Sequence, residues 1–205
     1  DVLGSRGLGD VYKRQGEEAP AHQPQLLPGQ VKLKNINGDD KLNEEDMVLI
    51  GRNDPKFIFG FNNNFSYKNF DLNIYMYGQV GKIAGANSYY DAWGSYGNRI
   101  KLGQNVPVSF KDAWSSDNQT STRPSFIESA YGTGDLFLQK ISFLRIRNIT
   151  LGYTVPISKS ICNRLRVYAD VNNPCVWTNW KGQDPETDSN TNAYPNVTSF
   201  SIGVD

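Results

Sequence analysis

The chain has 205 residues, and its 21 basic and 21 acidic side chains balance to a formal net charge of zero, which excludes an electrostatic case for nucleic-acid binding. Its one histidine, His22, argues against histidine-based catalysis and against a histidine-ligated metal site. No run approaches the roughly 18 consecutive apolar residues of a membrane-spanning helix, and the strands of a membrane barrel would carry no such run either.

Residues 1–15 (DVLGSRGLGDVYKRQ) differ in character from the remainder of the chain. They lack the apolar core of a secretory signal peptide, and from Ser5 to Gln15 they resemble the in-frame translation of a transposon-end sequencing adapter. We therefore predict that residues 1–15 are a non-native, adapter-derived tail that takes no part in the fold. The natural protein is expected to extend further in the N-terminal direction.

Residues 16–56 predict a loop that contains one turn of the EF-hand or dockerin type. Oxygen ligands recur there at alternate positions, as a calcium ion requires. The candidate ligands are the side chains of Asn35, Asn37, Asp39, Asn43 and Asp46 and the backbone carbonyl of Lys41. Asp40 stands where the sharp turn usually has glycine, and Asn35 stands where aspartate is usual. The open alternative is a solvated turn followed by a short helix that Asn43 caps.

Residues 57–80 predict an antiparallel hairpin. Apolar and polar residues alternate with a period of two through 57–67 and again through 70–80, which is the periodicity of strands. A short turn at Lys68–Asn69 separates the two runs. Each run has about 11 residues, the length that a tilted strand needs to cross a bilayer. The aromatic face would point either to lipid or to the core of a soluble sandwich.

Residues 81–134 predict a long irregular loop, rich in glycine and aromatic residues, and three more strands follow at 141–155, 164–177 and 197–205. In 141–155 the parity of the apolar positions changes, so we expect a bulge or a phase change near Arg147–Asn148.

Two further features concern the strand at 164–177. Pro174 removes a ladder hydrogen bond, so a bend is expected there. The two cysteines, Cys162 and Cys175, lie near opposite ends of this strand, so a disulfide between them is not expected.

Several motifs, in order, resemble the C-terminal barrel region of SusC/RagA-type TonB-dependent outer-membrane receptors. The family's PGD, NGDGKI, IG-x-x-x-P-[KR]-F, GFNN, SF-x-R-x-x-N-[IV]-T-L-x-Y and DPE patterns have counterparts at 28–32, 36–42, 50–57, 60–63, 142–153 and 184–186. The last strand, 197–205, also follows the family pattern. The chain departs from the family at Gln30, Asn35, Asp40 and Pro174.

The resemblance implies an all-β fold: a partial antiparallel transmembrane β-barrel, comprising about the last five strands of a 22-stranded TonB-dependent receptor, with long extracellular loops. Residues 57–205 would supply these strands and loops, truncated at both ends. The same resemblance implies a bacterial outer-membrane location, in a Bacteroidota-type organism. Five strands cannot close a barrel, so an isolated piece of this kind is expected to form a bent open sheet.

The function that the resemblance implies is TonB-dependent import of a glycan or oligopeptide. The expected partners are a SusD-like surface lipoprotein, TonB through a missing N-terminal part, outer-membrane lipid and the substrate, and no nucleic acid. No enzyme activity is expected, because the loop carboxylates show no nucleophile–base arrangement. The alternative is a soluble, secreted β-sandwich that binds glycans and has a calcium-stabilised loop. A sandwich would bury the aromatic face against a second sheet.

Overall fold

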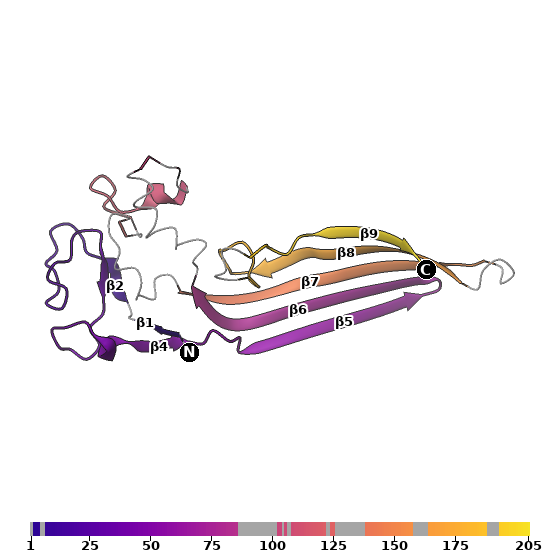
Figure 1. Ribbon diagram of the computed structural model, residues 1–205, viewed down its shortest axis with the longest axis horizontal. Helices are drawn as coiled ribbons and strands as arrows, with labels where there is room; N and C mark the ends of the chain where they lie inside the picture. The colour runs from indigo at the N-terminus through magenta and orange to yellow at the C-terminus, as the bar shows by residue number, and fades with distance from the viewer. Residues whose placement is uncertain are drawn as a thin grey trace. The chain divides into compact units, whose positions relative to one another are not determined.

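The computed structural model describes residues 2–4, 7–85, 102–103, 105, 108–121, 124–125, 138–157, 164–187 and 193–205. The chain divides into two compact units, one of residues 1–53 with 84–139 and one of residues 54–83 with 140–205. The regular elements within the described ranges are β-strands and short 3-10 helices (Figure 1). None of the described helices is long and apolar enough to span a membrane.

The first unit contains two small antiparallel sheets. Strand β1 (Val2–Gly4) pairs with β4 (Val48–Gly51), and β2 (Gly7–Tyr12) pairs with β3 (Val31–Leu33). Two 3-10 helices, η1 (Glu44–Asp46) and η3 (Val108–Asp112), complete its described elements. Among its described residues, the buried apolar side chains are Leu26, Val31, Leu33, Ala84 and Ala113.

These small sheets differ from the sequence expectation in two respects. Residues 1–15 contribute β1 and β2, although we expected them to take no part in the fold, and the expected loop 16–56 contains β3 and β4. β1, β3 and β4, with three or four residues each, carry too little alternation to be recognised by period, and β2 lies in the segment that was set aside as a tail. The adapter origin of residues 1–15 stays a prediction.

The second unit is built on one five-stranded sheet in the order β5-β6-β7-β8-β9. The strands are β5 (Phe57–Tyr67), β6 (Phe70–Gly85), β7 (Leu138–Val155), β8 (Leu165–Thr178) and β9 (Ser199–Val204). Figure 1 shows these strands following one another across the sheet in chain order. All five predicted strands are confirmed, and β6 and β7 are longer than the alternation indicated, because their added residues carry no clear apolar period.

The predicted hairpin is confirmed in register as well as in place. β5 pairs antiparallel with β6 without interruption, from Phe57 opposite Val80 to Tyr67 opposite Phe70. Lys68 in the turn has φ +54°, the left-handed conformation that a two-residue hairpin turn requires. The turn is further held by the N–H of Thr154, which donates to the carbonyl of Asn69.

The expected phase change near Arg147–Asn148 is also confirmed. The register between β7 and β8 shifts there, with Ile146 opposite Cys175 but Asn148 opposite Asn172. Two residues of β8, Asn173 and Pro174, therefore lie opposite the single Arg147. Asn173 has φ +48°, and the missing N–H of Pro174 falls at the bulge, where a paired ladder hydrogen bond is not needed.

Gly152 of β7 is required because a side chain passes directly over it. A Cβ built there would lie 2.5 Å from Arg166 Nη2 and 2.5 Å from Asp71 Oδ1. Arg166 thus crosses β7 from β8 and reaches Asp71 of β6, with an Nη2–Oδ2 distance of 2.6 Å. This ion pair links β8 to β6 and passes over a position of β7 that presents no side chain.

We predict that Gly152→Ala destabilises the protein by about 2 kcal/mol, because the added methyl group displaces the Arg166–Asp71 pair. Gly60→Ala on β5 is the matched control, since a Cβ there meets its nearest atom at an ordinary 3.5 Å. Both variants are compared with the unaltered protein by urea unfolding. Equal effects of the two substitutions would contradict the crossing described for Arg166.

Candidate functional site

One side of the five-stranded sheet, the apolar face, carries apolar side chains that are exposed or half-buried. It is defined by the register: Phe57, Phe59, Phe61, Phe65 and Tyr67 on β5, Phe70, Leu72, Ile74, Met76 and Val80 on β6, Ile149, Leu151, Tyr153 and Val155 on β7, Leu165, Val167, Ala169 and Val171 on β8, and Phe200, Ile202 and Val204 on β9. The rings of Phe70 and Tyr153, 4.7 Å apart, place the β6 and β7 rows on the same side.

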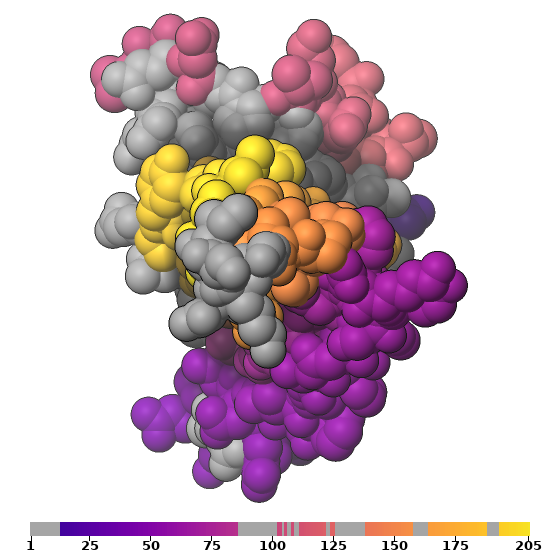
Figure 2. All heavy atoms as spheres, turned by 90° about the vertical axis from the view of Figure 1, so that its right-hand side faces the viewer, coloured from indigo at the N-terminus to yellow at the C-terminus, as the bar shows by residue number. Residues whose placement is uncertain are grey.

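The exposure of this face bears on the two settings that the sequence left open. Phe57, Phe61 and Phe65 are 61 %, 55 % and 58 % exposed, and Ile202 is 83 % exposed. A β-sandwich would have buried these side chains against a second sheet. An uncovered apolar surface of this extent marks a contact with another apolar medium. Figure 2 views the molecule from the end of the sheet that carries the Lys68–Asn69 turn.

The opposite side, the polar face, is held by hydrogen bonds between neighbouring strands. On β5 and β6, Asn73 Nδ2 donates to the Oδ1 atoms of Asn62 and Asn64 at 2.7 and 2.6 Å. On β7 and β8, Asp170 Oδ1 accepts from Asn148 Nδ2 at 2.7 Å and from the hydroxyl of Thr150. A sheet with one apolar and one hydrogen-bonded polar side is typical of a barrel wall between lipid and a wet interior.

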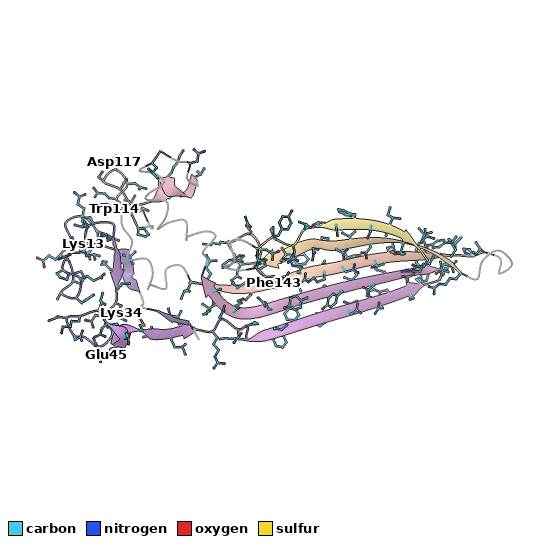
Figure 3. The ribbon with its side chains drawn as sticks, viewed as in Figure 1. Lys13, Lys34, Glu45, Trp114, Asp117 and Phe143 are labelled. Atoms are coloured by element: carbon cyan, nitrogen blue, oxygen red, sulfur yellow. The ribbon has the colours of Figure 1, made fainter. Side chains whose placement is uncertain are left out.

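A cluster of five side chains, here called the clasp, lies at the end of the polar face where β7 begins. It consists of Arg145 and Arg147 on β7 and of Asp184, Glu186 and Asn196 on the β8–β9 connection. Arg145 Nη2 donates to Asp184 Oδ1 at 2.7 Å, and its Nε lies 3.0 Å from Glu186 Oε2. Arg147 Nη2 donates to Glu186 Oε1 at 2.6 Å. Phe143, labelled in Figure 3, marks this end of the sheet.

The centre of the clasp is a buried ion pair, since Arg145 and Asp184 are each only 3 % exposed. Burial raises the pKa of the Asp184 carboxyl, but the N–H groups of Glu186 and Asn196 and the Arg145 guanidinium outweigh burial and hold the pKa below its usual 3.8. Asp184 Oδ2 accepts from the backbone N–H of Asn196 at 2.9 Å. The carboxylate is therefore fully satisfied, which is the condition under which a buried charge is tolerated.

The connection between β8 and β9 is fastened at its two ends as well. At its start, Asn179 Nδ2 donates to the carbonyl of Lys140 at 2.8 Å, and Asn179 Oδ1 accepts from the N–H of Ser142 at 2.8 Å. At its end, Asn173 Nδ2 donates to the carbonyl of Val197 at 3.2 Å, and the hydroxyl of Thr198 donates to the carbonyl of Asn173 at 2.8 Å. The bulge of β8 thus supplies one of the anchors of this connection.

The predicted calcium ligands do lie in one turn of the first unit, and Figure 3 labels Lys34 and Glu45 beside it. Three of their side-chain oxygens accept backbone N–H groups: Asn35 Oδ1 from Gly38, Asn37 Oδ1 from Asp39, and Asp39 Oδ1 from Lys41. These bonds fold the segment into consecutive Asx turns. A calcium ion prefers oxygen donors of this kind, and each bonded oxygen keeps a second lone pair.

Asn43 and Asp46 form the capping box that the alternative interpretation of this segment includes. Asn43 Oδ1 accepts from the N–H of Glu45, while the two carboxylate oxygens of Asp46 accept from the N–H groups of Asn43 and Ile36. Those two N–H groups lower the pKa of the fully buried Asp46 carboxyl. Within the described part of the chain, no group of three or more histidine, cysteine, aspartate or glutamate side chains could hold a metal ion. The calcium site stays a prediction.

Some predicted features fall partly beyond what the structure describes. The aromatic loop residues Tyr89, Tyr90, Trp93 and Tyr96 and the cysteine Cys162 lie outside the described residues. Cys175, on β8, is a free thiol. Trp114 is described and lies against Gly29, whose added Cβ would meet its ring at less than van der Waals distance.

The clasp is the feature that sequence reasoning missed. Asp184 and Glu186 were recognised as part of a motif, but they were thought to have no partner arrangement. The available signal was the placement of Arg145 and Arg147 on a strand whose polar side was expected to face inward. Two cations on such a face require acidic partners, but the sequence does not indicate which acidic residues these are.

Comparison with known proteins finds similar chains among TonB-dependent receptors. No protein-family model matches the chain. It is 28 % identical over 197 residues to TonB-dependent receptor P3 of Formosa agariphila, which covers 86 % of this chain and 19 % of that protein. It is 27 % identical over 176 residues to TonB-dependent receptor SusC of Bacteroides thetaiotaomicron, which covers 82 % and 17 %. The chain is similar to SusC/RagA-type TonB-dependent receptors over most of its length.

The fold agrees with this family. A chain in the structure of the RagAB peptide transporter superposes on 98 % of this chain with a TM-score of 0.69, at 22 % identity, and the match covers 22 % of that chain. The expected all-β architecture, an antiparallel sheet like that of a TonB-dependent receptor barrel, is confirmed. The chain spans about a fifth of the length of the curated receptors that it matches. These relatives are named as receptors and transporters, not as enzymes.

We predict that acid opens the clasp. Because the pKa of Asp184 is lowered in the folded protein, its contribution to stability is present above pH ~4 and is lost as the pH falls below that value. Hydrogen exchange of the Glu186 and Asn196 amides, which donate to Asp184, should therefore lose protection between about pH 5 and pH 2. The β5–β6 ladder is the internal control. Protection that stays constant at both sites over this range would contradict the prediction.

We predict that Ca²⁺ binds the 35–46 turn and that Asp39→Ala abolishes binding, because this substitution removes a carboxylate ligand. Terbium luminescence, with competition by calcium, measures the binding. Glu44→Gln is the control, since it removes a nearby charge that is not a candidate ligand. Absence of a signal from the unaltered protein, or equal binding by both variants, would favour the alternative of a solvated, capped turn.

Proposed function

We propose that this chain forms part of a receptor that imports nutrients across a bacterial outer membrane. The observation that carries the proposal is the two-sided sheet, with an exposed apolar face and a hydrogen-bonded polar face. β5 has 11 residues, so at about 3.4 Å per residue and a tilt of about 45° it spans ~26 Å along the membrane normal. That length matches the ~25 Å apolar band of outer-membrane barrels.

The lengths of the connections support an orientation in that membrane. The β5–β6 turn is two residues long, and β7 and β8 are separated by residues 156–164, both at one end of the sheet. The connections at the other end, 86–137 and 179–198, are much longer. Outer-membrane barrels have short periplasmic turns and long extracellular loops. We therefore infer that the end that carries the clasp faces the outside of the cell.

The partners and the class of substrate follow from the relatives. Receptors of this type are expected to work with a SusD-like surface lipoprotein and to take energy from TonB. The similarity to SusC and to the RagAB peptide transporter supports an organic nutrient as the cargo, either an oligosaccharide or an oligopeptide. The alternative of a soluble, glycan-binding sandwich is disfavoured by the exposed apolar face.

The proposal is tested on the full-length product of the gene in its own host. We expect the protein in the outer-membrane fraction, with electrophoretic migration that changes on heating, because barrels resist detergent until heated. A soluble product whose migration does not depend on heating would overturn the proposal and support the secreted sandwich.

Deletion of the gene identifies the cargo. We expect the mutant to lose uptake of one fluorescently labelled mixture, either oligopeptides or oligosaccharides, while uptake of the other is unchanged. A variant that lacks the TonB-interacting segment but reaches the outer membrane in normal amount should show the same loss. Uptake of both mixtures at the unaltered rate in the mutant would contradict a role in import of either class.

A further inference from the structure

We propose that Arg145 is a positioning residue that holds the β8–β9 connection as a fixed shelf across the polar face, at the outer entrance of the barrel. The shelf is defined as residues 179–187 with Asn196. The inference rests on the proposed function for the side of the membrane on which the shelf lies. The geometry of the shelf itself rests on contacts within the second unit alone.

The shelf lies on the polar side of the sheet. Phe143 and Arg145 are two residues apart on β7, so their side chains lie on the same side of the sheet. The Phe143 ring lies 5.8 Å from the ring of Tyr77, a residue of the polar face of β6. The guanidinium of Arg147 also stacks over Tyr77, at 5.7 Å. Asp184 and Glu186, which bind these arginines, must therefore approach the sheet from the polar side, which is the interior side of a barrel wall.

The shelf is packed as well as paired. Trp180 is 6 % exposed and Pro185 is fully buried, although both belong to a connection rather than to a strand. On the sheet, Ile141 and Phe143 are buried at the same end of β7. Connections normally run over the surface with exposed side chains. The burial of Trp180 and Pro185 therefore indicates that this segment packs against the rest of the second unit.

Arg145 connects these parts because it reaches both acidic residues at once. It contacts Asp184 at 2.7 Å and Glu186 at 3.0 Å from one nearly inaccessible position. Arg147 reaches Glu186 alone and is 34 % exposed. Loss of Arg145 would leave the buried Asp184 carboxylate without its cation, which is more costly than loss of a partly exposed pair. The two arginines therefore give a built-in comparison.

The shelf has a consequence for import. A fixed segment on the interior side narrows the entrance permanently, so cargo must pass beside it and not displace it. Opening the shelf is expected to make the entrance wider and less selective, without any change to the strands that form the wall.

The side of the membrane is tested first, in intact cells of the host that express the full-length receptor. In a background in which the native cysteines, Cys162 and Cys175 among them, are replaced by serine, Lys181→Cys places a thiol at an exposed position of the shelf, and Lys68→Cys places one in the opposite turn. A membrane-impermeant maleimide should label Lys181→Cys in intact cells and Lys68→Cys only after permeabilisation. The reverse pattern would overturn the orientation and hence the proposed function, while leaving the shelf geometry open to the next test.

The shelf is then tested by trypsin cleavage after Lys181, quantified by mass spectrometry on purified receptor in detergent. The unaltered protein should resist cleavage there. Arg145→Met should be cut roughly 100-fold faster, because cleavage follows the population of the opened segment. Arg147→Gln should be cut at most about 5-fold faster, as expected for a partly exposed pair. Lys140→Gln controls for loss of an exposed positive charge on the same strand.

Two further readouts separate positioning from general destabilisation. Heat-modifiable migration should be unchanged in Arg145→Met, and Arg145→Lys should recover part of the protection by keeping the cation next to Asp184. If Arg145→Met does not assemble, Glu186→Gln replaces it, since it removes the charge of the ion pairs that both arginines make with Glu186 and leaves Asp184 in place. Equal cleavage rates in the unaltered protein and in the assembled clasp variants would overturn the proposal.

Discussion

The pleat of the β-strand is the constraint on which the rest of this structure depends. Successive side chains must point to opposite sides, so a strand that separates two solvents has to alternate in polarity along its whole length. β5 and β6 satisfy this through eleven consecutive residue pairs, from Phe57 opposite Val80 to Tyr67 opposite Phe70. One uninterrupted register therefore gives the sheet an apolar side and a polar side, and the polar side carries the side-chain hydrogen bonds and ion pairs described above.

The polar side is organised by arginines that reach across strands. Arg166 passes over Gly152 to Asp71, and Arg145 reaches out of β7 to Asp184. The first pair fixes neighbouring strands at one end of the sheet, and the second fixes a connection at the other end. Each arginine lies near a special position of β7. Gly152 lies under Arg166, and the register shift between β7 and β8 occurs at Arg147, two residues from Arg145.

Much of this architecture could be predicted from the sequence, for physical reasons that also explain what could not. The five strands and the shift near Arg147 follow from period-two patterns, which are local. The strands β3 and β4 were missed because three or four residues do not establish a period, and β1 and β2 were missed because residues 1–15 were set aside as a non-native tail. The clasp was missed because Arg145 and Asp184 are 39 residues apart, and neither residue carries a signal that names the other. The calcium turn shows the opposite case, in which a local pattern gives a candidate ligand set without showing that an ion binds.

The unpaired edges of β5 and β9 determine how this sheet can be joined to other strands. Within the described residues each of these strands has a hydrogen-bonded neighbour on one side only. Its other row of N–H and C=O groups must be completed by another strand, in lipid above all, where water cannot serve. The interactions within the sheet thus fix its own register, whereas its two edge strands determine which other strands can pair with it. For barrel engineering, exchange of such a sheet between related receptors would therefore depend on strand pairing at β5 and β9, not on the interactions at its centre.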